Sequence, residues 1–260
     1  MEAIVKQLVI LFPQVNAAFS VAILIFARML GFIIQAPVFS RKEAPSMVRV
    51  CFALILTITL SSVIIPTIQA PAKYDLVLLI ILNLIVGTFI GFLAKVILIA
   101  VEAGADMINM QMGLSSAMVL DPASNKQVSL IEKIFSTLGV LIFINVGGIY
   151  WLIHAFIRSF DIFPVFAVSI PLEQIVNLNY VIKMTSNVLF MGLQIASPIL
   201  LATLGQDIIL GTISKTAPQI NVFQLSFLFK PVFGAAILTW IMPMMINVIS
   251  DYFMTYSNIF

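Results

Sequence analysis

The sequence predicts an all-α membrane protein with nominally six membrane-type helices that are interrupted at proline and glycine, and three observations support this fold class. Hydrophobic residues form 62% of the 260-residue chain and charged residues 9%, whereas soluble domains are about 45–50% apolar and about 25% charged. Stretches of roughly 20 residues without charge recur, which is the length of a helix that crosses about 30 Å of hydrocarbon. Runs such as residues 78–82 are continuously apolar, whereas the strands of a membrane barrel alternate.

Six charge-free stretches are the predicted helices, in chain order 7–27, 50–72, 76–94, 134–157, 184–206 and 231–250. The first is expected to be a helix of the protein and not a signal peptide. Glu2 lies among the first residues, and the apolar run continues to Ile34 without a clear cleavage site. Basic residues are more numerous in the connections after the first, third and fifth stretches, which favours the cytoplasm for those connections.

The composition excludes several classes of protein. A chain with so few polar residues is not an ordinary cytosolic enzyme, a disordered protein or a disulfide-stapled secreted domain. Cys51 is the single cysteine, so no intramolecular disulfide can form. The 13 basic and 11 acidic residues leave a net charge of +2, which is no electrostatic footprint for a nucleic acid. We therefore expect membrane lipid, and no nucleic acid, among the partners.

Prolines and glycines interrupt the apolar stretches. Each proline removes a backbone donor and is expected to kink or end a helix, although prolines are also commoner in membrane helices than in soluble ones. Gly147 and Gly148 are interpreted as a hinge or as a helix-packing feature. The prolines concerned are Pro37, Pro45, Pro198, Pro218, Pro231 and Pro243.

Three polar residues share one face of a predicted helix in the middle of the chain. Glu102, Asp106 and Asn109 follow one another at i, i+4 and i+7. A carboxylate at the bilayer centre costs roughly 2.5–3.5 kcal/mol, so this face is not expected to meet lipid. It either lies in solvated surroundings near the membrane surface or forms a polar contact with a partner or a pore. Small residues such as Gly104 would let a neighbouring helix approach closely.

A dense methionine cluster overlaps this face. Met107, Met110, Met112 and Met118 all fall within residues 107–118. Methionine is unbranched and fits irregular surfaces, so the cluster either seals around something variable or is ordinary core filler. Asp121 and Pro122 are predicted to form the turn that ends this element.

A third polar cluster lies at the edge of an apolar segment in the last third of the chain. Asp207 and Lys215 carry opposite charges. They pair with each other, pair with partner chains, or extend to the membrane interface as separate charges. The other members of the cluster are Gln206, Pro218, Gln219, Asn221, Phe223 and Lys230.

The sequence contains no pattern that is typical of catalysis or metal binding. His154 is the single histidine, and the nearest carboxylate is that of Asp161, seven residues further on, so an intramembrane enzyme lacks partner residues. Zinc motifs and a phosphate-binding loop are absent. We expect no enzyme activity, no cofactor and no metal. The alternative is a secondary transporter for a small solute, although Glu102 and Asp106 have no counterpart in a second half.

Three sequence blocks, one in each third of the chain, together resemble a known family. The first is Arg28-Met-Leu-Gly31, followed by Pro37, Arg41, Pro45 and Arg49. The second is Glu102-Ala-Gly-Ala-Asp-Met-Ile-Asn-Met-Gln-Met-Gly113, followed by Asp121 and Pro122. The third is Ala217-Pro-Gln-Ile-Asn-Val-Phe223, followed by Lys230. In this order and spacing, the blocks resemble the FliR/SpaR/SctT family of type III secretion export-gate proteins.

The resemblance implies a subunit of a protein-export gate. The chain length and the motifs favour the flagellar type over the injectisome. FliP and FliQ are the implied partner subunits of a helical pore through which unfolded polypeptides pass. Further implied contacts are with the large export-gate protein and the FliQ-adjacent switch protein. The implied location is the bacterial inner membrane at the flagellar basal body, in an assembly that is raised toward the periplasmic side.

The same resemblance implies a fold of helical hairpins that assemble with their partner subunits into the pore. The whole chain, residues 1–260, is expected to form one domain of this family. Residues from 1 to about 180 would be similar in structure to FliP, and residues from about 181 to 260 to FliQ.

The resemblance also implies roles for residues. Residues 106–122 correspond to the family loop that plugs the closed pore, and apolar constrictions can exclude water and ions. The candidates for this seal are Met107, Met110, Met112, Gly113, Leu114, Ser115, Asp121 and Pro122. The candidates for subunit contacts and structural roles are Arg28, Gly31, Pro37, Arg41, Pro45, Arg49, Glu102, Asp106, Asp207, Lys215, Pro218, Gln219, Asn221, Phe223 and Lys230.

Some positions depart from the family pattern and receive no fixed role. Lys215 stands where arginine is common, and Ser226 and Leu228 replace the glycine and proline of a Gly-Phe-Pro motif. The family's Asn-Gly-His in the fourth helix is replaced by Val146, Gly147 and Gly148.

Overall fold

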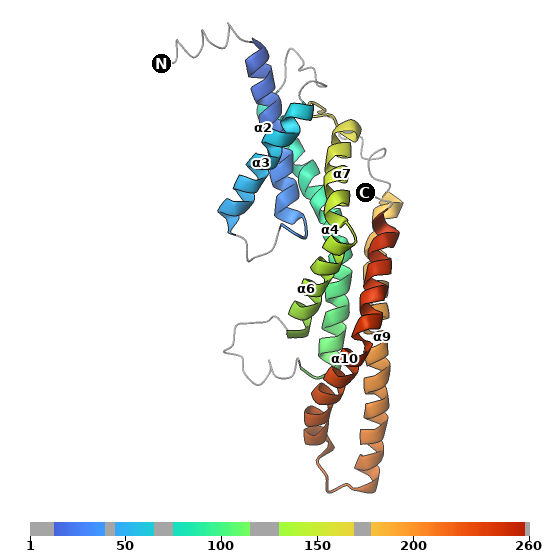
Figure 1. Cartoon of the computed structure of the whole chain (residues 1–260). Helices are drawn as coiled ribbons and strands as arrows, with labels where there is room; N and C mark the ends of the chain where they lie inside the picture. Colours follow the sequence, from blue (N-terminus) through green and yellow to red (C-terminus); the bar gives the residue numbers. More distant parts are fainter. Residues whose placement is uncertain (1–12, 40–44, 65–74, 115–129, 169–177, 258–260) are drawn as a thin grey trace. The chain divides into compact units, whose positions relative to one another are not determined.

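A computed structural model describes residues 13–39, 45–64, 75–114, 130–168 and 178–257 of the chain (Figure 1). Helices make up most of these residues, which contain no strand, so the predicted all-α fold is confirmed. The helices are α2 (Pro13–Gln35), α3 (Ser46–Ile64), α4 (Leu76–Gln111), α6 (Leu130–Asn145), α7 (Gly148–Ile162), α9 (Leu178–Thr216) and α10 (Val222–Ser257).

Three helices of the described part are long and apolar enough to cross a membrane, namely α4, Thr185–Thr216 of α9 and Val222–Tyr256 of α10. A fourth results if α6 and α7, which are separated by a bend, count as one broken span. Phe19–Gln35 in α2 and Ser46–Ser61 in α3 are shorter apolar helices. Each of the six predicted stretches therefore overlaps helical structure, although the stretch 134–157 is divided between α6 and α7, and three to four helices reach membrane length by size and composition.

The helix boundaries differ from the charge-free stretches because charged side chains do not end a helix. α4 continues past Lys95, Glu102 and Asp106 to Gln111. α9 has 39 residues and α10 has 36, so at 1.5 Å per residue each is roughly 54–58 Å long. That is nearly twice the thickness of the hydrocarbon core, which is about 30 Å.

The prolines divide into two sets. Pro198 lies inside α9, and Pro231 and Pro243 lie inside α10, so these three end no helix. The other three lie at helix boundaries, where the absence of a backbone donor costs least; they are Pro37 after α2, Pro45 before α3 and Pro218 after α9.

The chain divides into two compact units. The first unit takes its described residues from Met1–Lys95 and Tyr150–Leu178, and the second from Val96–Ile149 and Asn179–Phe260. α4 contributes its first part to one unit and its second part to the other. The prediction of a single domain, similar to FliP up to about residue 180 and similar to FliQ after it, stays a prediction.

In the first unit, α2 and the first part of α4 cross with their backbones in contact. A Cβ atom added at Gly31 would collide with the backbone oxygen of Leu84. A Cβ atom added at Gly87 would collide with the backbone oxygen of Arg28. Glycine at both positions therefore permits the close helix crossing, as small residues do at helix interfaces in membranes.

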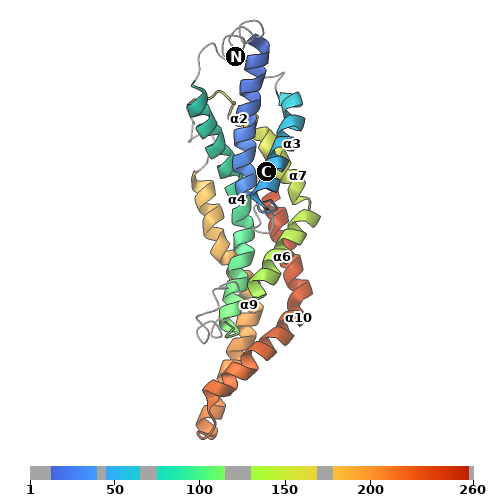
Figure 2. The same ribbon diagram turned by 90° about the vertical axis from the view of Figure 1, so that its left-hand side faces the viewer.

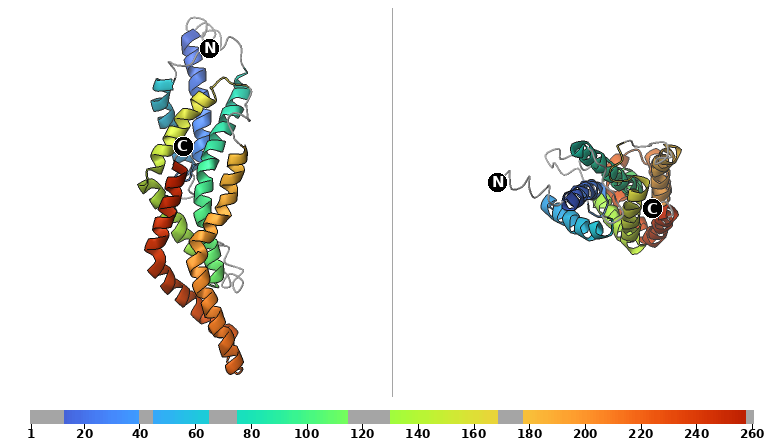
Figure 3. Two further views of the ribbon diagram at one scale, coloured as in Figure 1. Left: turned by 90° about the vertical axis from the view of Figure 1, so that its right-hand side faces the viewer. Right: turned by 90° about the horizontal axis from the view of Figure 1, so that it is seen from above.

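In the second unit, α9 and α10 form a hairpin whose turn follows Thr216, as Figures 2 and 3 show from two sides. Near the open end of the hairpin, the Asn187 side-chain amide donates a 3.1 Å hydrogen bond to the Tyr256 hydroxyl. The second part of α4 crosses α9 where Gly104 meets Gly192. A Cβ atom at Gly104 would lie 2.9 Å from the backbone oxygen of Gly192.

The two adjacent glycines between α6 and α7 have different roles. Gly147 has a φ angle of +92°, which is favourable for glycine alone, and its N–H donates to the Ile144 carbonyl at 3.1 Å where α6 ends. Gly148 begins α7, and a Cβ atom there would collide with the ring of Phe143. Gly147 is thus a hinge, and Gly148 is a packing position.

Candidate functional site

Arg28 lies at the centre of a buried polar network that joins three segments of the chain. Its side chain has no exposed surface, and the guanidinium contacts α4 and the end of α7. Nε and Nη2 donate to the Asn83 side-chain oxygen at 3.0 and 2.7 Å. Nη1 donates to the Ser159 backbone oxygen at 3.0 Å and to its hydroxyl at 3.2 Å, and Nη2 donates to the Phe163 backbone oxygen at 2.8 Å.

These contacts satisfy all the hydrogen-bonding capacity of the buried cation. A guanidinium group carries five N–H donors, and each has an oxygen acceptor here. The acceptors are neutral, and two of them are carbonyl oxygens of the last turn of α7 and the residue after it. The C-terminal end of a helix carries a partial negative charge, so α7 stabilises the cation. The guanidinium carbon also lies 4.2 Å from the ring centre of Phe160.

Asn83, Ser159, Phe160 and Phe163 are the members of this network that the sequence did not single out. Asn83 is buried and, besides accepting from Arg28, donates to the backbone oxygens of Leu79 at 2.8 Å and Val165 at 3.0 Å. A lone asparagine in the apolar run 76–87 is the signal that could have found it, because an amide in such a run needs a partner.

The Glu102 face places its three residues in different surroundings. Glu102 is half-buried and accepts a 2.8 Å hydrogen bond from the Ser136 hydroxyl of α6. Asp106 is exposed, and Asn109 is buried. Residues seven apart are separated by roughly 10 Å along a helix axis, so each meets a different neighbour. Glu102 therefore makes a polar contact within the chain itself.

The methionine-rich end of α4 is closed by a hydrogen-bonded cap. The Gly113 N–H donates to the Met110 carbonyl at 3.1 Å, and the Leu114 N–H donates to the Asn109 carbonyl at 3.3 Å. Gly113 has a φ angle of +73°. This is the Schellman arrangement, in which glycine ends a helix and turns the chain away from its axis.

The seal candidates near this cap differ in exposure. Met110 is 70% exposed, whereas Met112 is 1% exposed. Met107, Gly113 and Leu114 are half-buried. The cluster is therefore neither uniformly core filler nor a uniform apolar surface. Ser115, Asp121 and Pro122 lie outside the described residues.

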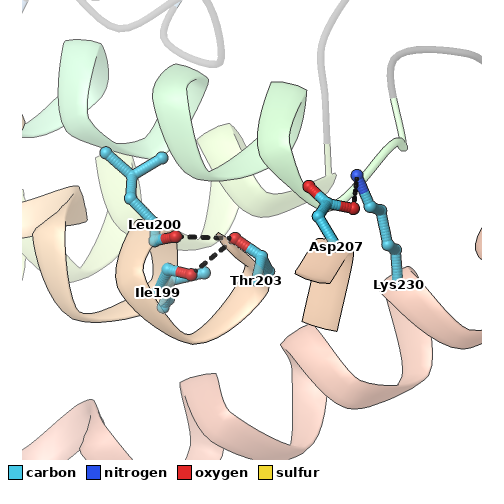
Figure 4. A network of polar contacts seen from close by, with 5 residues as sticks. All are labelled: Ile199, Leu200, Thr203, Asp207 and Lys230. Atoms are coloured by element: carbon cyan, nitrogen blue, oxygen red, sulfur yellow. Dashed lines mark hydrogen bonds and ion pairs between the residues drawn. The ribbon is translucent and has the colours of Figure 1, made fainter. Parts of the chain in front are cut away.

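Asp207 and Lys230 form an ion pair across the α9–α10 hairpin, with 2.7 Å between Oδ1 and Nζ (Figure 4). Asp207 retains 38% exposure of its side chain and Lys230 retains 21%. One turn before Asp207, the buried Thr203 hydroxyl donates to the Ile199 backbone oxygen at 2.7 Å (Figure 4). Asp207 therefore pairs within the chain, but with Lys230 and not with the predicted Lys215, which is exposed.

The polar turn of the hairpin is exposed. Asn221 accepts a hydrogen bond from the Gln224 N–H at 3.3 Å and so caps the start of α10. Pro218 and Gln219 are exposed, as is Phe223 at 79%.

The remaining candidates occupy several environments. Gly31 and Pro37 are buried, Arg49 is half-buried and Pro45 is exposed, while Arg41 lies outside the described residues. His154 is exposed and stacks on Tyr150 with 6.2 Å between ring centres. Among the described residues, no three His, Cys, Asp or Glu side chains are grouped so that they could hold a metal ion.

Comparison with known proteins gives one consistent result. Residues 19–256 match the family described as "Bacterial export proteins, family 1". The flagellar biosynthetic protein FliR of Escherichia coli (strain K12) is 26% identical over 218 residues, which cover 84% of this chain and 82% of the relative. FliR of Bacillus subtilis (strain 168) is 28% identical, with 79% of each chain covered. FliR of Aquifex aeolicus (strain VF5) is 24% identical, covering 92% of this chain and 91% of the relative.

Proposed function

Because the chain belongs to the bacterial export proteins of family 1, we propose that it is a subunit of the flagellar type III protein-export gate. It assembles with FliP and FliQ in the inner membrane at the flagellar basal body, in a complex that is raised toward the periplasmic side. The assembly forms the channel through which unfolded export substrates pass. This role requires no catalysis by the chain itself. The match over residues 19–256 carries the proposal, since it includes both compact units.

The surface of the α9–α10 hairpin supports an obligate assembly. Each helix is too long for one bilayer, so part of the hairpin lies outside the hydrocarbon. The half that contains the ion pair and the polar turn is the part best suited to that position. The same half exposes large apolar side chains, which need a protein partner when lipid does not cover them; they include Ile208, Ile209, Phe223, Leu228 and Phe229.

The end of α4 supports the second element of the proposal, a plug over residues 106–122 that seals the closed channel. Met110 presents a flexible apolar side chain at the surface. Gly113 turns the chain out of the helix directly after it. An apolar constriction blocks ions by excluding water, and a methionine side chain can adapt to a threaded polypeptide. The polar turn between α9 and α10, with the exposed residues Pro218, Gln219 and Phe223, is the part proposed to contact neighbouring subunits or the large export-gate protein.

One experiment tests both elements. The wild-type chain and a variant lacking residues 111–116 are purified from bacterial membranes, and the mass and subunit composition of each intact complex are measured. Ion permeability of the cells is measured in parallel. We expect both chains to carry FliP and FliQ at a fixed stoichiometry, and the deletion to make the cells leaky.

The outcomes separate the alternatives. A chain that purifies alone or as a small homo-oligomer contradicts the export-gate assembly and favours a solute transporter. A deletion that prevents assembly while leaving the ion permeability unchanged contradicts the plug and makes residues 111–116 a packing element.

A further inference from the structure

Two methionines at the end of α4 point in opposite directions. Met110 is 70% exposed and Met112 is 1% exposed. Residues two apart on a helix lie about 200° apart around its axis, so the exposure of one is compatible with complete burial of the other. The inward position of Met112 is therefore a specific contact and does not follow from the general apolar character of the cluster.

Met112 is buried against a glycine of α10. A Cβ atom added at Gly234 would lie 2.7 Å from Cγ of Met112, 3.0 Å from Cε and 3.2 Å from Sδ. All three nearest atoms to that position belong to this one side chain. Gly234 thus forms a notch in α10 that the Met112 side chain fills. Gly205 and Gly211 of α9 differ, because a Cβ atom at either would meet nothing within 4 Å.

Contacts within the second unit fix both α10, which carries the notch, and α4, which carries Met112, against α9. Gly234 lies one helical turn after Lys230, which pairs with Asp207 of α9 at 2.7 Å. The backbone of α4 contacts α9 where Gly104 meets Gly192. α4 is therefore in contact with both helices of the hairpin, with one at its glycine crossing and with the other at its last turn.

We propose that Gly234 is a positioning residue for the part of the seal that ends α4, residues 110–114: by receiving Met112, it fixes the end of α4 against the α9–α10 hairpin. Met112 immediately precedes Gly113, whose left-handed backbone sets the direction in which the chain leaves the helix. The direction in which the chain leaves α4 at Gly113 therefore depends on the position of the hairpin. This inference rests on the proposed function, because the seal is the element that is positioned.

The test fills the notch and then restores the space. Gly234→Leu expels Met112, and leucine is chosen because it favours a helix, so that the change acts through volume. Met112→Ala vacates the notch. We expect cells with Gly234→Leu to become several-fold more permeable to ions while the complex is recovered in normal yield. The double variant Gly234→Leu/Met112→Ala should return most of the way to the wild type, because leucine and methionine have similar volumes.

Two sets of variants control for the added side-chain volume and for loss of assembly. Ser186→Leu introduces the same side chain at an exposed position in the other half of α9, away from the ion pair, and is expected to leave the ion permeability unchanged. If Gly234→Leu prevents recovery of the complex, the milder Gly234→Ala and Met112→Ala decide, and each is expected to raise the permeability by a smaller factor.

The outcomes distinguish a failure of this inference from a failure of the proposed function. If deletion of residues 111–116 makes the cells leaky but none of the Gly234 and Met112 variants does, the notch does not position the seal. The same conclusion follows if the double variant is as leaky as Gly234→Leu. If the deletion itself has no effect on permeability, the proposed seal is wrong and the positioning role falls with it.

Discussion

Arg28 in the first unit and the Asp207–Lys230 pair in the second are two ways of accommodating charge among apolar helices. Arg28 has no exposed surface and five hydrogen bonds to neutral oxygens of α4, of α7 and of the residue after α7. The Asp207–Lys230 pair has an oppositely charged partner for each residue but retains 38% and 21% exposure. The first arrangement is complete within the chain, whereas the second leaves surface at which another molecule can bind.

The difference has a physical consequence for what each site can do. A buried cation is tolerable only while all its acceptors remain in position, so Arg28 fixes the arrangement of α2, α4 and α7. A partly exposed ion pair is worth little to stability, because solvent screens it. Its charges are correspondingly free to act in recognition. We therefore propose that Arg28 stabilises the fold and that the pair contributes to subunit contact, and three predictions test this division.

The largest effect is expected from Arg28→Leu. Removal of the guanidinium leaves the Asn83 side-chain oxygen and the Phe163 backbone oxygen buried without their donor, whereas the Ser159 backbone oxygen keeps the Phe163 N–H at 2.9 Å. An unsatisfied buried polar group costs about 1–3 kcal/mol, so the loss of unfolding free energy should be about 3 kcal/mol or more. Thermal unfolding of the purified complex measures it. Arg28→Lys should also be destabilised, because three donors on a flexible stem cannot replace the five of a planar guanidinium.

Two further variants test the cause of that loss. The double variant Arg28→Leu/Asn83→Leu should recover only part of the stability, since it removes the Asn83 oxygen that lacked a donor but also takes the Asn83 amide from the buried Val165 backbone oxygen. The exposed Arg158 of α7 is the control, and Arg158→Lys should leave the unfolding temperature unchanged. An Arg28→Leu complex that unfolds at the wild-type temperature would contradict the stabilising role of the network.

A smaller loss of unfolding free energy is expected from Gly87→Ala. This variant tests whether the contact between the backbones of α2 and α4 at Arg28 is as intolerant of change as the side-chain network. The added Cβ atom collides with the backbone oxygen of Arg28, and a backbone group cannot move aside as a flexible side chain can. Overpacking of this kind costs about 1–3 kcal/mol, measured by the same thermal unfolding. Gly211→Ala in the open surface of α9 should instead be neutral or gain up to about 1 kcal/mol from helix propensity. Equal effects at both positions would show that propensity, and not the crossing, is decisive.

The helical fold could be predicted from the sequence because composition and apolar runs report it directly. The helix ends could not be predicted from charge-free stretches, because Lys95, Glu102 and Asp106 are compatible with an α-helix. What ends α4 is the left-handed backbone at Gly113. A glycine that ends a helix and one that lies in open space, such as Gly205, look alike in the sequence.

The hydrogen-bond and packing partners of the candidate residues could not be predicted from the sequence. Arg28 bonds to residues that are 55, 131 and 135 positions away, and two of those acceptors are backbone oxygens, which carry no sequence signal. The inward position of Met112 likewise depends on Gly234 in a distant helix. Pairing of Asp207 with Lys230 instead of Lys215 follows from the hairpin, which brings residues on either side of its turn together.

Of the three predictions, the smallest effect on stability is expected at the Asp207–Lys230 pair. Its main effect is instead expected on binding of the partner subunits. Asp207→Lys and Lys230→Asp each place like charges side by side, and loss of an exposed pair costs about 0.2–1 kcal/mol. We expect either variant to co-purify with markedly less of the partner subunits, although its unfolding temperature changes little. Subunit composition of the purified complex measures the first quantity, and thermal unfolding the second.

The exchanged pair separates the two roles of these charges. Asp207→Lys/Lys230→Asp restores attraction within the hairpin, so a purely internal role predicts full recovery of the complex. A partner that recognises the charges predicts that co-purification stays low while the unfolding temperature recovers, which is the result we expect. The exposed Lys183 at the other end of α9 is the control, because Lys183→Glu also reverses a charge but lies away from the pair. If both single variants assemble normally, the pair has no part in subunit contact, and the contrast with Arg28 reduces to a difference in burial.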